Sequence, residues 1–455
     1  MRRFSKNLVA CANRNETDQI HGVQYYLYDS LLNCKSFNGF ELMGIFNIHT
    51  FECTCKMPDY NFSKVYGLLR SYIKERSKSS SYYKKLFPKF PERYRDVIAK
   101  PIVSRSTKKY RLKRRIRFFP VVNVEYGIRL FLFCVGNIGT VKIIVDPVIL
   151  SHAHREEFDP DSFDYMKLSD RDNKFWLEVV KYVEKFAFDW YITGVPGQKL
   201  SLSRVDIAAN IKVDSHYSIS TLLYYYKRSI KRKSYRNIHY KHRDQDKNML
   251  ECMNLSQRFT IYNKSYEQYW KHGKVYPCKV LRLEYKIYPR RLYMYRRQYR
   301  NEKHREYHLT MREILEMISR DAPFIMYEAI RKIFKDGDFY SEKAFTKSAS
   351  KTCKRDSVLN DTLILMHHLS KFTSYDNIMK SLSDFKKVHG DSSTYRRLKF
   401  LKDLNVSPIL LDSEDTSRYK KFPSVMSLFL SAIINGYNSG SSDELDYIQS
   451  FLPDQ

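Results

Sequence analysis

Hydrophobic and polar residues follow one periodicity up to about residue 305 and another beyond it. In the first part, short runs alternate hydrophobic and polar residues, which is typical of strands with one buried face. We expect strands at residues 39–55, 118–125, 129–136, 140–145, 200–213, 258–264 and 279–287. Between them, runs with helical spacing are found at residues 61–75 and 175–190.

Beyond residue 305 the hydrophobic residues recur with a helical period, as they do on amphipathic helices. Such helices are expected at residues 310–320, 327–334, 359–371, 375–388 and 394–404. The pattern therefore predicts an α+β fold, in which a mainly antiparallel sheet with flanking helices is followed by an all-α domain. We divide the chain into an N-terminal extension with a basic arm (1–117), a sheet domain (118–305) and a helical domain (306–455).

The charge balance points to a polyanionic partner. Lys and Arg number 80 against 50 Asp and Glu, which gives a formal net charge of +30 over 455 residues. An excess of this size favours nucleic acid as the partner, although a lysine-rich surface can also serve solubility alone. The hydrophobic share of 43% allows a sizeable core and excludes a disordered chain. No apolar run is long enough to cross a membrane, so we expect no membrane partner, and we expect a cytoplasmic protein with reduced cysteines.

Three short motifs carry the residues that phosphoryl transfer needs. They are Ser203-Arg204-Val205-Asp206, Tyr262-Asn263-Lys264-Ser265-Tyr266-Glu267 and Arg282-Leu283-Glu284. A tyrosine oxygen can attack phosphorus, a Lys or Arg can stabilise the developing charge, and carboxylates can hold a divalent cation. A phenolate also leaves more readily than an alkoxide, which suits reversible strand breakage. The alternative is a core tyrosine beside an ordinary Arg–Glu pair.

The order and spacing of these motifs resemble the filamentous-phage gene II/gene X replication protein family over residues 120–300. Its members carry an S-R-I/V-D strand, a Y-x-K-x-x-E segment and an R-F-E strand, and Leu283 here replaces the aromatic residue of the last motif. The resemblance implies a rolling-circle replication initiator with an HUH-like catalytic domain. It implies that Tyr262 nicks one strand, forms a 5′-phosphotyrosyl link, frees a 3′-OH primer and later rejoins the displaced strand. The catalytic residues expected beside it are Lys264, Glu267 and Arg282.

A divalent metal ion, Mg²⁺ or Mn²⁺, is the expected cofactor. The candidate ligands are Asp206, Glu284, His152 and His154. The His-x-His pair resembles the two-histidine metal motif of HUH nucleases, and the alternative is a surface loop before Arg155. Tyr266 lies four residues after Tyr262, so on a helix the two would share a face, with Tyr266 as a second nucleophile or as a packing aromatic.

Two stretches interleave basic and aromatic residues, at 224–236 and 289–297, and they flank the motifs in sequence. Cations neutralise phosphates and rings stack on unpaired bases, so both stretches are expected to bind DNA; the alternative is a solvated helix face. Two helices and a polar turn at 375–406 resemble a helix-turn-helix, whose second helix could enter a major groove. The residues expected to bind DNA are Lys227, Arg228, Lys231, Arg232, Lys233, Arg236, Arg290, Arg291, Arg296, Arg396 and Arg397.

The expected partner of such an initiator is origin DNA, duplex and single-stranded, together with the helicase and polymerase of a bacterial host. A non-catalytic basic DNA-binding regulator or packaging protein stays as an alternative, and so does a mobilisation relaxase, which shares the chemistry. The combination of Asp206, Tyr262 and Glu284 separates an enzyme from a pure binder, because a binder has no need of it.

Overall fold

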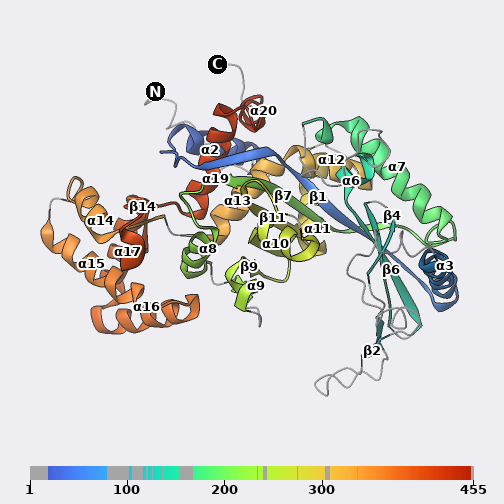
Figure 1. The fold of residues 1–455 in the computed structure, drawn as a ribbon, viewed down its shortest axis with the longest axis horizontal. Coiled ribbons are helices and arrows are strands. Elements are labelled where there is room, and N and C mark those ends of the chain that lie inside the picture. Colours follow the sequence, from blue (N-terminus) through green and yellow to red (C-terminus); the bar gives the residue numbers. More distant parts are fainter. Residues whose placement is uncertain are drawn as a thin grey trace.

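The structure is a computed structural model with one large antiparallel sheet, helices packed against it, and a smaller sheet with further helices at one side (Figure 1). It describes residues 19–78, 102–104, 116–118, 121–125, 127–135, 137–152, 168–232, 234–238, 243–273, 275–302, 308–335, 337–353 and 355–451. The α+β class predicted from the periodicity is confirmed. In these ranges, none of the helices has the length and apolar character that a membrane span requires.

The large sheet has eleven strands, and each of its pairings is antiparallel. They are β1 (Phe40–Pro58), β2 (Ile102–Ser104), β3 (Ile116–Phe118), β4 (Val122–Glu125), β5 (Ile128–Val135), β6 (Ile138–Val145), β7 (Ser201–Val213), β8 (Arg236–Asn237), β9 (Met249–Met253), β10 (Gln257–Asn263) and β11 (Lys279–Ile287). In space the order is β2-β3-β5-β6-β1-β7-β11-β10-β9-β8, and β4 pairs with β5. The strands that carry the three motifs, β7, β10 and β11, are therefore close neighbours.

Strand β1 lies in the middle of this sheet and pairs with β6 on one side and β7 on the other. The division that placed residues 1–117 in a separate extension is therefore wrong, because β1 completes the sheet. The pairing of β1 with β7 is interrupted between Met43 and Asn47 and again between Ile48 and Thr50. At the second irregularity His49 has no residue opposite it on β7. A bulge of this kind can change the direction in which a side chain points. The basic arm at 108–117 falls largely outside the described residues.

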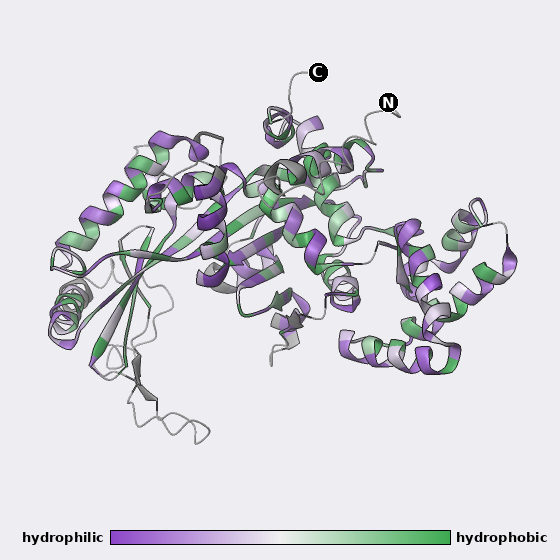
Figure 2. Cartoon of the chain, turned by 180° about the vertical axis from the view of Figure 1, so that it is seen from behind, coloured by the Kyte–Doolittle hydropathy of each residue, from purple (hydrophilic) through white to green (hydrophobic). Residues whose placement is uncertain are grey.

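The two faces of the sheet differ in chemistry because residues alternate along each strand. One face is apolar and carries residues such as Phe51, Val205, Ile207, Phe259 and Leu283, all buried in the main core. Figure 2 shows helices with mixed hydrophobic and hydrophilic residues around the sheet, as expected of helices with one buried side. The other face carries the polar residues of the motifs.

The first two thirds of the chain also contribute helices to the fold. They are α2 (Gln19–Leu32), α3 (Asp59–Lys78), α6 (Pro147–His152), the 3₁₀ helix η3 (Leu168–Arg171), α7 (Asn173–Asp189), α8 (Ile219–Arg228), α9 (Arg243–Lys247), α10 (Lys264–His272) and α11 (Pro289–Glu302). Helix α7 was predicted from the spacing at 175–190, and its Phe175, Trp176 and Val179 are buried in the core.

Residues beyond 305 do not form a separate all-α domain. Helices α12 (Met311–Arg320), α13 (Ala322–Ile333) and α19 (Val425–Asn438) pack on β1 of the large sheet. Gly436 of α19 makes this approach close, since a Cβ there would meet the Leu42 carbonyl oxygen at 2.8 Å. Helix α20 (Glu444–Gln449) is tied to the same strand through Glu444, which receives a hydrogen bond from the backbone N–H of Phe46.

The remaining C-terminal elements form a module beside the large sheet, on the left in Figure 1. Its helices are α14 (Glu342–Ala349), α15 (Asp356–Ser370), α16 (Tyr375–His389), α17 (Asp391–Asp403) and the short α18 (Ser413–Thr416). Its small sheet has the order β13-β12-β14, formed by β12 (Asp338–Tyr340), β13 (Val406–Leu410) and β14 (Lys421–Phe422). The prediction of an all-α C-terminal part is wrong here too, because this module contains three strands. Strands of three, five and two residues are hard to distinguish from loops by their hydrophobic pattern alone.

Candidate active site

The register of three neighbouring strands brings the motif residues onto one face of the sheet. Arg282 on β11 lies opposite Tyr262 on β10, and Lys286 on β11 lies opposite Asp206 on β7. Residues opposite each other in an antiparallel pair project to the same side, and so do residues two apart along a strand. We call this side, with Tyr262, Arg282, Glu284, Lys286 and Asp206, the polar face.

Tyr262 lies near the end of β10, just before α10 begins, and only 6% of its surface is exposed. Burial raises the pKa of the Tyr262 phenol well above its ordinary value, while the nearby guanidinium of Arg282 acts in the opposite direction. Arg282 also donates a hydrogen bond to the phenol oxygen, which favours the phenolate. The resting side chain is therefore a protonated phenol beside a group suited to stabilising its anion.

Arg282 is itself fixed by two residues that the sequence analysis missed. Its Nε donates to Oδ1 of Asn210 at 2.7 Å, and its Nη1 lies 3.1 Å from Nε2 of His49. Asn210 stands opposite Arg282 in the ladder of β7 and β11, and His49 is the residue at the irregularity of β1. With only 1% of its surface exposed, the guanidinium has little freedom to turn away from Tyr262.

His49 is a neutral hydrogen-bond acceptor in this arrangement. Burial lowers the pKa of His49 well below its ordinary value, and the neighbouring cation of Arg282 adds to the shift. Its Nε2 faces the Arg282 donor, so its proton is on Nδ1, which lies 3.8 Å from Oδ2 of Asp146. A neutral imidazole of this kind orients the guanidinium without adding charge to the site.

Acidic and basic side chains alternate along the rest of the polar face. Lys142 of β6 pairs with Glu52 of β1 at 2.7 Å, and Glu52 also accepts from Arg204 at 3.1 Å. Arg204 then reaches Asp206 through Nε at 2.9 Å. Asp206 accepts a further hydrogen bond from the Thr50 hydroxyl at 2.8 Å. Three neighbouring strands, β6, β1 and β7, are thus joined by charge-assisted contacts.

The two carboxylates predicted as metal ligands do approach each other, but a lysine lies between them. Nζ of Lys286 is 3.1 Å from Oε1 of Glu284 and 3.7 Å from Oδ2 of Asp206. Burial raises the pKa of Asp206, and the cations of Lys286 and Arg204 counteract this. Both oxygens of Asp206 already have basic or hydroxyl partners, so the donor set does not fit a divalent ion in this arrangement.

Asp206 is also distant from the nucleophile. Asp206 lies opposite Lys286, four residues along β11 from the Arg282 that faces Tyr262. That separation is roughly 13 Å along the strand. Within the described part of the chain, no cluster of three or more His, Cys, Asp or Glu side chains could hold a metal. His154 and the side chain of His152 fall outside the described residues, so the His-x-His prediction has no outcome here.

The Y-x-K-x-x-E segment spans a strand end and a helix start. Lys264 begins α10 and its Nζ pairs with Oε2 of Glu267 at 2.9 Å. Asn263 caps the helix by accepting from the backbone N–H of Tyr266 at 3.0 Å. Because Tyr262 is on the strand and Tyr266 is on the helix, the two tyrosines do not share a helix face.

The first basic stretch is mostly internal. Arg228, at the end of α8, is 0% exposed and donates to the Ser370 and Phe372 carbonyl oxygens at 2.7 and 3.1 Å. It also pairs with Asp412 at 3.0 Å, so it joins the large sheet to the C-terminal module. Lys231 is 3% exposed and lies over the Tyr375 ring. The prediction that Arg228 and Lys231 bind phosphates is wrong, because both are enclosed by protein.

The neighbours of these two residues are less enclosed. Lys227 is half-buried and pairs with Asp246 at 3.0 Å, and Arg232 is exposed. Lys233 and the side chain of Arg236 are outside the described residues.

The second basic stretch forms helix α11 and has an exposed side. Arg291 stacks over the ring of Tyr295, and Arg296 donates to the Leu202 carbonyl oxygen at 3.2 Å, so both are only partly exposed. The exposed side carries Arg290, Tyr293, Met294 and Arg297. Their spacing of three, four and seven residues places them on one side of the helix.

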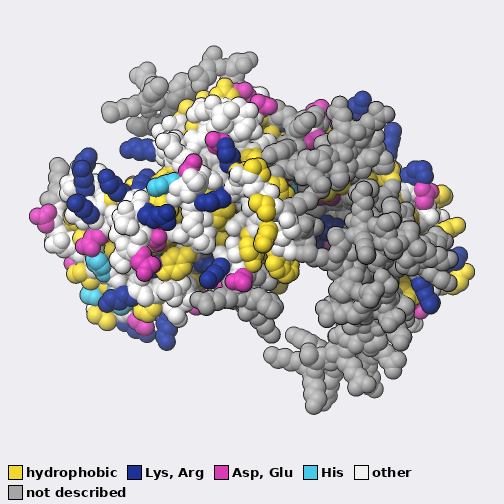
Figure 3. Space-filling model, viewed as in Figure 1, with side chains coloured by type: hydrophobic (Ala, Val, Ile, Leu, Met, Phe, Trp, Pro, Cys, Tyr) yellow, Lys and Arg dark blue, Asp and Glu magenta, His cyan; other side chains and the backbone are white. Residues whose placement is uncertain are grey.

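Helices α16 and α17 lie next to each other, as predicted, and are joined at Gly390. Gly390 has φ +82°, which suits glycine at such a tight turn. On α17, Arg396 is exposed, whereas Arg397 is buried, lies over the Phe385 ring and pairs with Asp361 at 3.3 Å. The prediction of a DNA contact therefore fails for Arg397 and stays open for Arg396. Figure 3 shows Lys and Arg side chains spread over this part of the surface.

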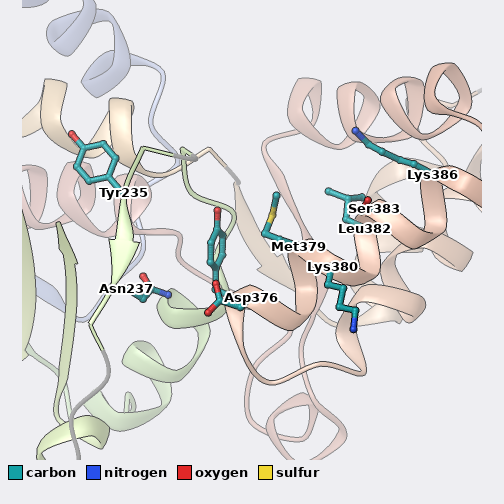
Figure 4. Close-up of a pocket in the computed structure, with 9 residues that line it drawn as sticks. Tyr235, Asn237, Asp376, Met379, Lys380, Leu382, Ser383 and Lys386 are labelled. Atoms are coloured by element: carbon teal, nitrogen blue, oxygen red, sulfur yellow. The ribbon is translucent and has the colours of Figure 1, made fainter. Parts of the chain in front are cut away.

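A cleft of about 690 Å³ lies between the short edge strand β8 and helix α16 (Figure 4). Tyr235 and Asn237 line one side, and Met379, Lys380 and Lys386 line the other. The described residues that line it include none from the polar face. We therefore place the candidate active site at Tyr262 and Arg282 and not in this cleft.

Comparison with known proteins adds no relative. A scan of protein-family models finds no match for the chain, and a search of curated proteins also finds none.

Proposed function

We propose that the protein cleaves and rejoins one DNA strand through Tyr262, as a rolling-circle replication initiator similar to the filamentous-phage gene II/gene X family. The observation that carries the proposal is the pairing of a buried tyrosine with a fixed arginine, Tyr262 opposite Arg282. The net charge of +30 supports a polyanionic substrate.

In the cleavage step the Tyr262 oxygen attacks a backbone phosphorus. A phosphotyrosyl bond forms, the bond from phosphorus to the 3′ oxygen breaks, the phenol loses its proton and the 3′ oxygen gains one. Arg282 stabilises the phenolate before attack and the negative charge on phosphorus during it. Rejoining is the same step in reverse, since the phenolate is the leaving group.

His49 and Asn210 are positioning residues in this scheme. They accept hydrogen bonds from Arg282 and hold its guanidinium toward Tyr262. Glu284 and Glu267 are the carboxylates whose charges act on the Tyr262 phenol, and they are the acceptors that the site offers for its proton. No step requires a metal at Asp206 and Glu284.

The proposal is tested with the full-length protein and a supercoiled plasmid that carries the DNA flanking its own gene. We expect nicked circles and a protein–DNA adduct that survives SDS when the reaction contains Mg²⁺. Tyr262→Phe keeps the ring and removes the nucleophile, so both products should vanish. Tyr266→Phe is the matched control and should keep both. Adduct formation by Tyr262→Phe would overturn the assignment.

A non-catalytic DNA-binding protein is the second candidate, favoured by the exposed basic side of α11. The same experiment separates the two, because a pure binder retains the plasmid on a gel without nicking it.

A further inference from the structure

Four basic side chains on the polar face share an arrangement with a buried acid beneath each one. The pairs are Lys142–Glu52 at 2.7 Å, Arg204–Asp206 at 2.9 Å, Lys286–Glu284 at 3.1 Å and Arg258–Glu251 at 3.2 Å. The basic side chains are 23–30% exposed, whereas their acidic partners are 1–10% exposed. The charge that reaches the surface here is therefore positive.

Some surface pairs of this protein are built differently, although Lys421–Asp338 at the small sheet, with side chains 30% and 2% exposed, shares the arrangement. In Lys185–Asp189 on α7 the two side chains are 74% and 49% exposed, and in Lys387–Asp384 on α16 they are 73% and 53% exposed. Both partners of such pairs face water, so neither sign dominates and the interaction is weak. Burying the four carboxylates costs free energy of desolvation, which is offset only while each carboxylate keeps its cation.

The four cations form a row across the sheet. They come from β6, β7, β11 and β10, with β1 between the first two supplying Glu52. Register fixes their order, because Glu52 lies opposite Arg204, Asp206 lies opposite Lys286, and Lys286 lies opposite Arg258. Five adjacent strands span roughly 19 Å, which is long enough for several phosphates of one strand.

We propose that Lys142, Arg204, Lys286 and Arg258 are a phosphate-binding row that holds the backbone of one DNA strand across the sheet. The buried acids position these cations and leave their outer N–H groups for phosphate oxygens. The identification of the ligand as a DNA strand rests on the proposed function, but the row itself does not depend on strand cleavage.

The row also relates to the nucleophile. Arg258 and Tyr262 are four residues apart on β10 and point to the same face, roughly 13 Å from each other. A strand bound along the row would therefore enter the site at a fixed distance from the attacked phosphate. This gives Asp206 and Glu284 a role as positioning residues for Arg204 and Lys286 in place of the metal ligation expected from the sequence.

The test measures how the affinity for a fluorescent oligo-dT strand depends on salt, using the full-length protein. Lys142→Met with Arg258→Met removes the two ends of the row and keeps the side-chain length. If both touch phosphate, the slope of log affinity against log salt should flatten by about 1.4, at about 0.7 for each contact. Lys185→Met with Lys387→Met is the matched control and should keep the parent slope.

An unchanged slope in the Lys142/Arg258 variant would overturn the row. A second variant, Lys286→Met with Glu284→Gln, tests the middle of the row. It removes one cation together with its acid, so that no buried carboxylate is left unpaired by the change at Glu284. The slope of log affinity against log salt should flatten by about 0.7. Thermal unfolding identifies folded variants. Adduct formation at Tyr262 is scored separately, so the row can fail while the proposed function stands, and the reverse.

Discussion

The stretches at 224–236 and 289–297 are both rich in tyrosine and basic residues, yet the fold uses them in opposite ways. In the first, Arg228 and Lys231 are buried and clamp the C-terminal module to the sheet. In the second, α11 buries Leu292 and Tyr299 and turns Arg290 and Arg297 outward. Composition alone cannot tell these cases apart, because the partners of a buried cation come from distant sequence.

Arg228 shows how distant those partners are. Its acceptors are on α15, at Ser370, and at Asp412, about 140 and 180 residues away. The aromatic residues around it serve the same junction, since Tyr224 donates to Asp412 and Tyr225 donates to Asp415. A tyrosine-rich basic segment therefore indicates either a DNA surface or an internal junction, and burial decides between them.

The largest expected effect concerns the buried cation. Arg228→Met should lower the free energy of unfolding by about 3–5 kcal/mol, because it leaves the Ser370 and Phe372 carbonyl groups without their donor and Asp412 without its cation. Urea unfolding followed by circular dichroism measures this. Arg290→Met on α11 is the control and should change stability by less than about 0.5 kcal/mol. If both variants lowered the free energy of unfolding equally, the two stretches would not differ in their structural role.

The exposed tyrosine of the second stretch should matter for binding and not for stability. Tyr293 is 65% exposed, so Tyr293→Ala should weaken binding to single-stranded DNA by about 1–3 kcal/mol through loss of base stacking. Tyr293→Phe keeps the stacking surface and should bind like the parent. Fluorescence anisotropy with oligo-dT measures both. If Tyr293→Ala bound oligo-dT with the affinity of the parent protein, this side of α11 would not contact the DNA.

The smallest effect is the loss of two exposed cations. Arg290→Ala with Arg297→Ala should flatten the salt dependence of oligo-dT binding by about 1.4 if both contact phosphate. Stability should be unchanged, which distinguishes these arginines from Arg228. A parent slope would mean that the strand follows the polar face without reaching α11.

The sequence was informative about strands and about the central pair of the site. Alternation along 258–264 and 279–287 predicted β10 and β11, and Arg282, which the motif resemblance placed beside Tyr262, lies opposite it in the sheet. His49 could not be found this way, since it reaches the site through an irregularity of β1, more than two hundred residues earlier in the chain. Lys286 was missed because its role depends on the register of β11 with β7.

The domain division failed for a related reason. Periodicity predicts that α12 and α13 are helices, but it does not say which surface their apolar sides cover. In the structure they pack on β1, so the chain after residue 305 completes the core of the large sheet.

The central claim, that Tyr262 is the nucleophile, is tested most directly by locating the DNA on the protein. After the adduct has formed and the DNA has been trimmed with nuclease, trypsin cuts after Arg258 and Lys264 and so separates Tyr262 from Tyr266. Mass spectrometry should find the nucleotide on the peptide of residues 259–264, whose tyrosine is Tyr262. A nucleotide on the peptide of residues 265–271, or on any other tyrosine, would contradict the account.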